Sequence, residues 1–372
     1  MAEKELKWYG IFVVLFGTIL SIADPITDFL TLVEFYRTDH KTWFGVGLTF
    51  IILPSLFFLL INVNYELNSR SDDEECQSKA RKFTHVSVLG CNPLLPAWLK
   101  LRTLYCYLKK LLKLRQGNNT DQTDEDLDGL LDLSKVAVLA EAALESAPQF
   151  IIQLYAMAVQ QQSVSIIQMV SLPVSFLSMA WASTVGDEFV SGDEENFHFS
   201  VKHTVLLFVT HLLVLSSRLF AVALFTESYK WWVTSVLILH CTVITICDRV
   251  WLCRAHRNLY GRRQSVIVFC LHWLRDDLSF DDFGQNKLLN MQLVSNVLFV
   301  IENITLILLF YFSNFPHTWY SLPVTICVCL FAVLGAVMRL THFHYLRRNQ
   351  TEYRRSNSIE MSSNRSGVAA IS

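Results

Sequence analysis

A strip of polar side chains interrupts the apolar stretch "AEAALESAPQFIIQLY" at residues 140–155. Its members recur at every fourth position: Glu141, Glu145, Gln149 and Gln153. Residues four apart lie close to one face of an α-helix, so this spacing predicts carboxyl and amide groups on a shared face. Pro148 lies inside the strip and removes a backbone hydrogen bond, which predicts a kink or a loosely wound turn. In a soluble protein this strip would be an ordinary polar face, so its role depends on the solvent around the helix.

The composition indicates that this solvent is lipid. Of 372 residues, 52% are hydrophobic and only 17% are charged, whereas a soluble domain has about 25% charged residues. The apolar residues form runs close to the roughly 20 residues that a helix needs to cross a bilayer: 8–23, 43–63, 163–185, 201–225, 231–246, 288–312 and 321–340. The stretch 141–160 has a similar length if its polar face turns inward. We therefore predict an all-α, polytopic transmembrane bundle of eight spans.

The first run also has the form of a signal peptide, with a basic start and the small residues of Ser21-Ile22-Ala23 as a cleavage site. Because the helix-compatible run continues past Asp24 to Phe35, we interpret it as a first span that is retained.

Basic residues predict which side of the membrane each link occupies. Lysine and arginine crowd 70–115, 254–287 and the segment from Arg347, whereas the links 37–41, 159–162, 226–230 and 313–319 are short and poor in arginine. Positive charge marks the cytosolic side, and acidic residues carry little weight, so the acidic link 185–200 does not change the assignment. We expect a multi-pass protein with both termini in the cytosol.

The two halves of the chain have a similar order of segments, which predicts two pseudo-repeats within one membrane domain. Each half reads span, span, basic cytosolic stretch, span, span, and each basic stretch holds an apolar piece too short to cross. These pieces predict interfacial or re-entrant helices. Repeats with polar, interrupted helices are typical of proteins that move something across the bilayer. The predicted parts are a domain at 1–347, with repeats at about 8–185 and 201–347, short helices at 86–99 and 265–274, and a disordered cytosolic tail at 348–372.

Charged residues inside the predicted spans are the candidate site. A charge at the centre of a membrane costs about 2.5–3.5 kcal/mol on insertion scales, so such residues usually line a hydrophilic path or pair with each other. The acids outnumber the arginines here, even when Asp248 and Arg249 near one span end are counted. An alternative is that single residues such as Asp24 or Arg218 only join helices. The predicted path residues are Asp24, Asp28, Glu141, Glu145, Gln149, Arg218 and Glu302.

Several of these segments resemble the XK-related family. The resemblance rests on "ESAPQ" followed by "QLY", on the DxxxD pair of the first span, and on "SLPVSFLSMAW", "SRLFAVALF" and "ENITLIL", and it covers about 8–347. It implies an eight-helix plasma-membrane protein built from two pseudo-repeats. Several members of this family scramble phospholipids and expose phosphatidylserine when cells die. The resemblance also implies that the acids of the first half, together with Arg218 and Glu302, match the polar positions of the family.

We expect passive, ATP-independent movement of phospholipids along the polar path, because a polar face lowers the cost of carrying a headgroup through hydrocarbon. No phosphate-binding loop is visible, and we interpret the lone "GVG" at 45–47 as a flexible helix start. The scattered histidines His203, His211, His240 and His272 are interpreted as hydrogen-bonded helix residues. We therefore predict no enzyme activity, cofactor, metal or nucleic-acid partner. A small-solute transporter and a non-transporting scaffold remain alternatives.

The resemblance also bears on partners, because some family members are linked by a disulfide to an extracellular peptidase. The predicted outward links of this chain hold no cysteine. We expect any single-span membrane partner to be held non-covalently, on small residues such as Gly335 and Ala336.

The sequence also bears on how the activity of the protein would be switched on. Family members that act in dying cells are typically cut by a caspase near a terminus, after an aspartate, but residues 347–372 contain no aspartate. Asp124 and Asp128 of the linker 118–131 are the accessible candidates, although we interpret this linker as a solvated acidic segment. Ser356 and Ser358 follow paired arginines and are candidate phosphorylation sites.

Overall fold

The computed structural model describes residues 9–68, 95–115, 130–131, 133–135, 137–159, 165–191, 201–230, 232–240, 242–243, 285–313, 318–342 and 344–345. These residues are helical apart from short turns, and no strand occurs among them, which confirms the all-α class. The helices are α1 (Tyr9–Arg37), α2 (Lys41–Asn68), α4 (Leu95–Arg115), the π-helix η1 (Ala142–Ser146), α6 (Ala147–Val159), α7 (Ile166–Ser191), α8 (Val201–Tyr229) and α11 (Gln285–Ser313). A final apolar helix occupies Ser321–His342.

Five helices in the described part of the chain are long and apolar enough to cross a membrane. They are Val14–Arg37, Ile166–Asp187, Val201–Tyr229, Leu293–Ser313 and Ser321–His342. The first of them is longer than the apolar run 8–23, since α1 continues through Asp24 and Pro25 to Arg37. The chain is thus a helical, multi-pass membrane protein. The count of eight spans and the pseudo-repeats stay predictions.

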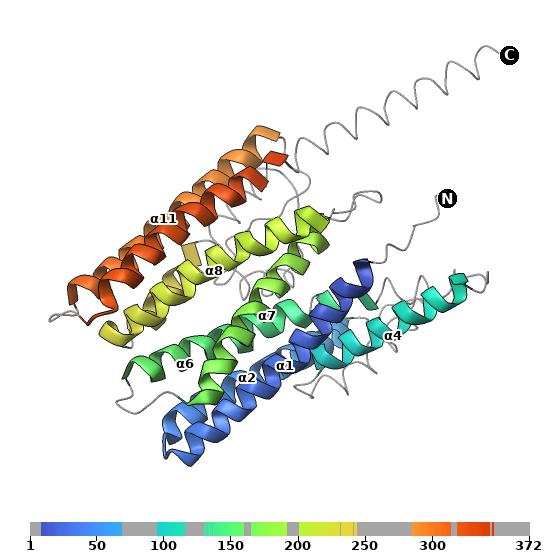
Figure 1. Cartoon of the computed structure of the whole chain (residues 1–372), viewed down its shortest axis with the longest axis horizontal. Helices are drawn as coiled ribbons and strands as arrows, with labels where there is room; N and C mark the ends of the chain where they lie inside the picture. Colours follow the sequence, from blue (N-terminus) through green and yellow to red (C-terminus); the bar gives the residue numbers. More distant parts are fainter. Residues whose placement is uncertain are drawn as a thin grey trace, which may run out of the picture.

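Helix α8 lies in the middle of the bundle. It packs against α11 on one side and against α6 and α7 on the other, and the helix Ser321–His342 lies beside α11 (Figure 1). Helix α1 contacts α7, α2 and α4. The two largest apolar clusters lie on the two sides of α8: one centres on Phe150, Met179, Leu215 and Leu219, and the other on Val222, Ile307, Phe310 and Val328.

The distribution of side chains is that of a membrane protein, with apolar groups outside. Large apolar side chains such as Phe29, Val205 and Leu330 are exposed on the outer surface, where lipid tails solvate them at no cost. Many polar and charged side chains are instead buried between the helices, among them Asp28 and Arg218. This arrangement places the candidate path residues inside the bundle.

The chain around Pro148 is wound as the sequence predicts. The five residues of η1 form a π-helix, in which the amide of Ala147 donates to the carbonyl of Ala142. Pro148 has no amide hydrogen, so the regular α-helical ladder cannot continue through it, and a wider turn accommodates the defect. Such π-bulges occur frequently at functional sites.

The predicted short helix at 86–99 is only partly correct. Helix α4 begins at Leu95 and continues to Arg115, so it is longer and far more basic than the apolar piece in the sequence. It is not among the helices that are apolar enough to cross a membrane. Residues 86–94, the second predicted short helix at 265–274, the charged residues Asp248 and Arg249, and the tail lie outside the described residues.

Candidate functional site

Asp28 is the centre of a buried polar cluster that joins three helices. Its Oδ1 accepts hydrogen bonds from Gln153 Nε2 at 3.1 Å, from Ser171 Oγ at 3.0 Å and from Ser175 Oγ at 3.1 Å. Gln153 Nε2 also donates to Ser171 Oγ at 3.1 Å. Helices α1, α6 and α7 therefore meet at one carboxyl group.

Asp24 lies one turn before Asp28 on α1 and makes a second link. The hydroxyl of Ser146 donates to Asp24 Oδ2 at 2.7 Å, which ties η1 to α1. Ser146 is three residues before Gln149 and so shares the face of the predicted polar strip. The prediction considered only residues four apart and therefore did not include Ser146.

Gln149 connects this cluster to α2. Its Nε2 donates to the carbonyl oxygen of Gly47 at 2.6 Å. A Cβ atom at position 47 would contact Leu32 Cδ2, and would lie 3.1 Å from Gln149 Oε1. The interpretation of "GVG" as a flexible helix start is therefore wrong for Gly47, which permits a close approach of α2 to α6.

Glu141 and Glu145 lie beside the two aspartates. Both glutamates are almost completely buried, and both are within electrostatic range of Asp24 and Asp28. Lys100 of α4 also acts on Glu141, with the opposite charge. Among the described residues, one oxygen of each of the four carboxyl groups has no hydrogen-bond partner. The cluster thus holds four buried acids close together, with acceptor capacity to spare.

A second polar cluster lies on the other side of α8. Arg218 Nη1 forms an ion pair with Glu302 Oε2 at 2.9 Å and donates to Asn303 Oδ1 at 3.2 Å. His240 Nδ1 lies 2.6 Å from the same oxygen of Glu302. Arg218 is buried, and its Nε and Nη2 have no partner within the part of the chain that the structure describes. The predicted residues of the second half therefore contact each other directly.

The seven predicted path residues thus divide into two groups. Asp24, Asp28, Glu141, Glu145 and Gln149 meet between α1, α2, η1, α6 and α7. Arg218 and Glu302 meet between α8 and α11.

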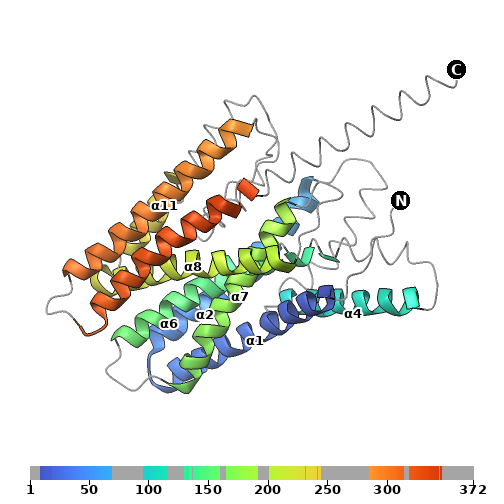
Figure 2. The same cartoon turned by 45° about the horizontal axis from the view of Figure 1, so that its top comes forward.

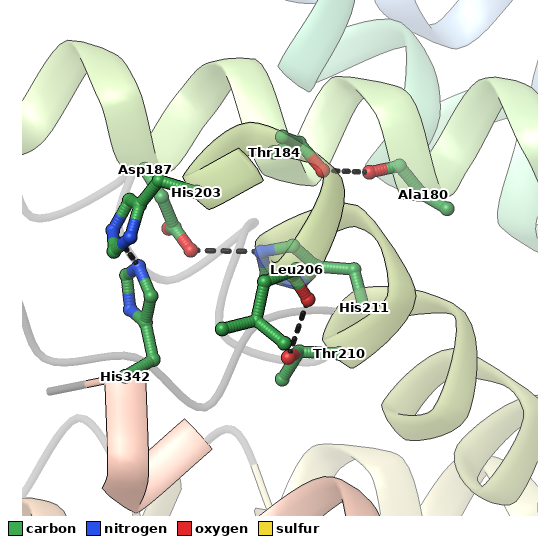
Figure 3. A network of polar contacts seen from close by, with 8 residues as sticks. All are labelled: Ala180, Thr184, Asp187, His203, Leu206, Thr210, His211 and His342. Atoms are coloured by element: carbon green, nitrogen blue, oxygen red, sulfur yellow. Dashed lines mark hydrogen bonds and ion pairs between the residues drawn. The ribbon is translucent and has the colours of Figure 1, made fainter. Parts of the chain in front are cut away.

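Three of the four predicted histidines contact neighbouring helices, as the sequence predicts, and Figure 3 shows two of them, His203 and His211. His211 Nε2 lies 2.7 Å from Asp187 Oδ2, joining α8 to α7, and His203 Nε2 lies 2.6 Å from His342 Nε2, joining α8 to the last helix. His240 contacts Glu302, and His272 lies outside the described residues. Across the described ranges, no group of three or more histidine, cysteine or acidic side chains is placed to hold a metal.

Sequence reasoning missed several contributing residues. Ser171 and Ser175 are four apart in "SLPVSFLSMAW" and lie on one face of α7, so the spacing was a usable signal. Asn303 follows Glu302 directly, but nothing in the sequence links it to Arg218 across 85 positions.

One small-residue prediction is also wrong. Gly335 and Ala336 are buried, and a Cβ atom at Gly335 would lie 2.9 Å from Val214 Cγ2. Gly335 therefore packs against α8 of the same chain, and Ala336 is buried as well, so neither residue offers an exposed surface to a partner. The candidate regulatory residues Asp124, Asp128, Ser356 and Ser358 lie outside the described residues.

Comparison with known proteins agrees with the resemblance. A family model described as XK-related protein matches residues 12–348, which is most of the chain. The curated protein named XK-related protein 9 from Tetraodon nigroviridis is 28% identical over 179 residues, covering 45% of this chain and 45% of that protein. The chain therefore matches less than half the length of this relative. Because the family model extends over nearly all of the membrane bundle described above, the chain belongs to the XK-related family.

Proposed function

We propose that this protein is a phospholipid scramblase, which moves lipids passively in both directions and exposes phosphatidylserine. The observation that carries the proposal is the buried acid cluster around Asp28, inside a bundle whose outer surface is apolar. A lipid headgroup loses its hydration when it enters hydrocarbon, and polar protein groups along the route compensate for that loss. The lipid tails need no such help, because they stay in the bilayer.

The two polar clusters suit the two charges of a lipid headgroup. The spare oxygens of Asp24, Asp28, Glu141 and Glu145 would accept hydrogen bonds from the ammonium group of ethanolamine or serine. The spare guanidinium nitrogens of Arg218 would donate to a phosphate, which Arg binds well because its planar group offers several donors. No cofactor, nucleotide or catalytic step is part of this proposal.

A small-solute transporter is the second candidate, and one observation favours it. The four acids are enclosed between helices, as they would be in a central solute site, whereas a lipid path must open sideways toward the bilayer. A scramblase therefore requires that α1 separates from its neighbours while lipids move. A third candidate, a membrane scaffold, predicts that neutral replacements of the acids are tolerated.

Reconstitution in liposomes distinguishes these functions. The purified full chain is placed in vesicles that contain fluorescent phospholipids and a trapped soluble dye. A scramblase makes the labelled lipids of both leaflets accessible to a membrane-impermeant quencher, without release of the dye. Quenching of the outer leaflet alone would overturn the proposal and leave the transporter and the scaffold.

The double variant Glu141→Gln with Glu145→Gln tests the site itself. Glutamine keeps the size and the hydrogen-bonding groups and removes the charge, so the fold should survive. We expect lipid movement and phosphatidylserine exposure to fall severalfold at equal surface expression. Unchanged lipid movement would make both residues packing elements.

The cellular setting follows from the same proposal. We propose that the protein acts in the plasma membrane with both termini in the cytosol, and that any single-span partner is bound non-covalently. Activity would be constitutive or controlled by phosphorylation, calcium or that partner. The candidate phosphorylation sites are Ser356 and Ser358.

A further inference from the structure

Helix α4 has one face that packs on the bundle. Leu99 and Thr103 on this face are fully buried, and α4 contacts α1. Leu99 also belongs to an apolar cluster with Ala137 and Ala140 of the segment that leads into η1. The helix is therefore attached to the elements that carry the acid cluster.

The opposite face of α4 carries an exposed apolar stripe. Its residues and exposed fractions are Leu101 at 48%, Tyr105 at 64%, Leu108 at 43% and Leu112 at 60%. At about 100° per residue these positions fall on one narrow line along the helix. This line spans most of α4, although the helix is too polar to cross a membrane.

Basic residues flank the exposed apolar stripe of α4. Helix α4 contains no acidic residue, and its basic residues are Lys100, Arg102, Lys109, Lys110, Lys113 and Arg115. Arg102 and Lys109 are exposed and lie about a quarter turn from the stripe. The guanidinium of Arg102 is 5.3 Å from the ring centre of Trp98, an aromatic residue on the same flank.

We propose that α4 is a binding surface for anionic phospholipids, with its apolar stripe in the headgroup–acyl boundary of the leaflet. Exposed apolar residues beside lysine, arginine and tryptophan are the pattern of helices that lie in a membrane interface. The charge of α4 selects lipids with net negative headgroups over neutral ones. The two views of the bundle show α4 starting beside the first turns of α1 and running outward past them (Figures 1 and 2).

The lipid-binding face is connected to the acid cluster through the helix itself. Lys100 lies on the inner side of α4, where it is buried and acts electrostatically on Glu141. Movement of α4 on the leaflet would therefore change the charge environment of a path residue. The lipid-binding proposal stands apart from the scramblase proposal, because binding at α4 requires no lipid movement.

Photo-crosslinking of the full chain in liposomes tests the proposal. The photoreactive residue p-benzoylphenylalanine replaces Leu108 in one protein and Val209 in another, and the lipid adducts are measured by mass spectrometry. Val209 is the matched control, since it has similar exposure on the lipid-facing side of the span α8. The vesicles contain phosphatidylcholine with or without phosphatidylserine.

We expect the adduct at Leu108 to rise severalfold with phosphatidylserine and to fall again in high salt, while the adduct at Val209 stays constant. Replacing Arg102 and Lys109 with glutamine should lower the Leu108 adduct by about fivefold for each lost cation, since each is worth about 1 kcal/mol near an anionic surface. Equal yields in both vesicles, or an adduct with protein in place of lipid, would overturn the proposal. Both leaflets of such vesicles have the same composition, so these results do not depend on scrambling.

Discussion

Substitutions of Asp28 distinguish most clearly between a role in the stability of the fold and a role in lipid transport. Removing its carboxyl group in Asp28→Ala leaves three buried donors without their acceptor, those of Gln153, Ser171 and Ser175. Hydrogen bonds between membrane helices average about 0.6 kcal/mol each, which gives about 2 kcal/mol for three. A buried donor left without a partner costs about 1–3 kcal/mol, and only the serine hydroxyls can turn to a backbone carbonyl. We expect a loss of about 2–4 kcal/mol in the free energy of unfolding.

Asp28→Asn keeps one accepting oxygen for these three donors, removes the charge, and places an amide group where Oδ2 has no partner among the described residues. Its free energy of unfolding should therefore fall less than that of Asp28→Ala, since only the new amide group lacks a partner, while lipid movement falls severalfold. Unfolding in mixed detergent micelles gives the stability, and the liposome assay gives the transport. The matched control is Asp39→Asn, because Asp39 is 82% exposed in its ion pair with Lys41 and has a φ of 64°, which asparagine tolerates. If Asp28→Ala is as stable as wild type, the hydrogen-bonded cluster does not hold the helices together.

Three further predictions follow from the packing and the charges. Gly47→Ala should destabilise the bundle by about 1–3 kcal/mol through overpacking, whereas Gly45→Ala, with nothing within 4 Å of its Cβ, should be neutral or slightly stabilising in the same unfolding assay. Arg218→Met should destabilise the fold by about 3 kcal/mol, because Glu302 then keeps only His240 as a charged neighbour. The double variant with Glu302→Met should recover much of the loss, since it also removes that carboxyl group; equal stabilities of single and double variants would contradict this. Executioner caspase should leave residues 347–372 intact on a denaturing gel, and a shortened tail fragment would show that the rule of cleavage after aspartate fails here.

The sequence predicted the class of fold and the kinds of residue in the site. Apolar runs mark helices independently of their partners, and buried charges stand out against an apolar background, so Asp24 and Arg218 could be identified without a structure. The partners of these residues could not be predicted. Whether Ser171 reaches Asp28 depends on the rotation of α7 about its axis, and the role of Gly47 depends on the distance between α2 and α6.

The boundaries of α4 show a related limit. The apolar signal ends near Leu99, where lysine and arginine begin to alternate with leucine. A search for apolar runs therefore stops there, although the helical period continues to Arg115. Amphipathic, basic helices need a periodicity analysis in place of a hydropathy analysis.

The acids of the two polar clusters differ in how completely they are paired, and this difference bears on whether they serve helix packing or transport. In the second cluster Glu302 contacts both Arg218 and His240, as expected for a group that joins helices. In the first cluster neutral donors bind Asp24 and Asp28, Lys100 acts on Glu141, and each of the four acids keeps an oxygen without a partner among the described residues. Packing alone would favour amides or apolar groups at these positions, because four buried acids exceed the charge of the one lysine that acts on them, and unbalanced buried charge lowers stability. Retention of such costly groups is expected where a ligand with its own positive charge visits the site, which the charge-neutral variants of Asp28, Glu141 and Glu145 test directly.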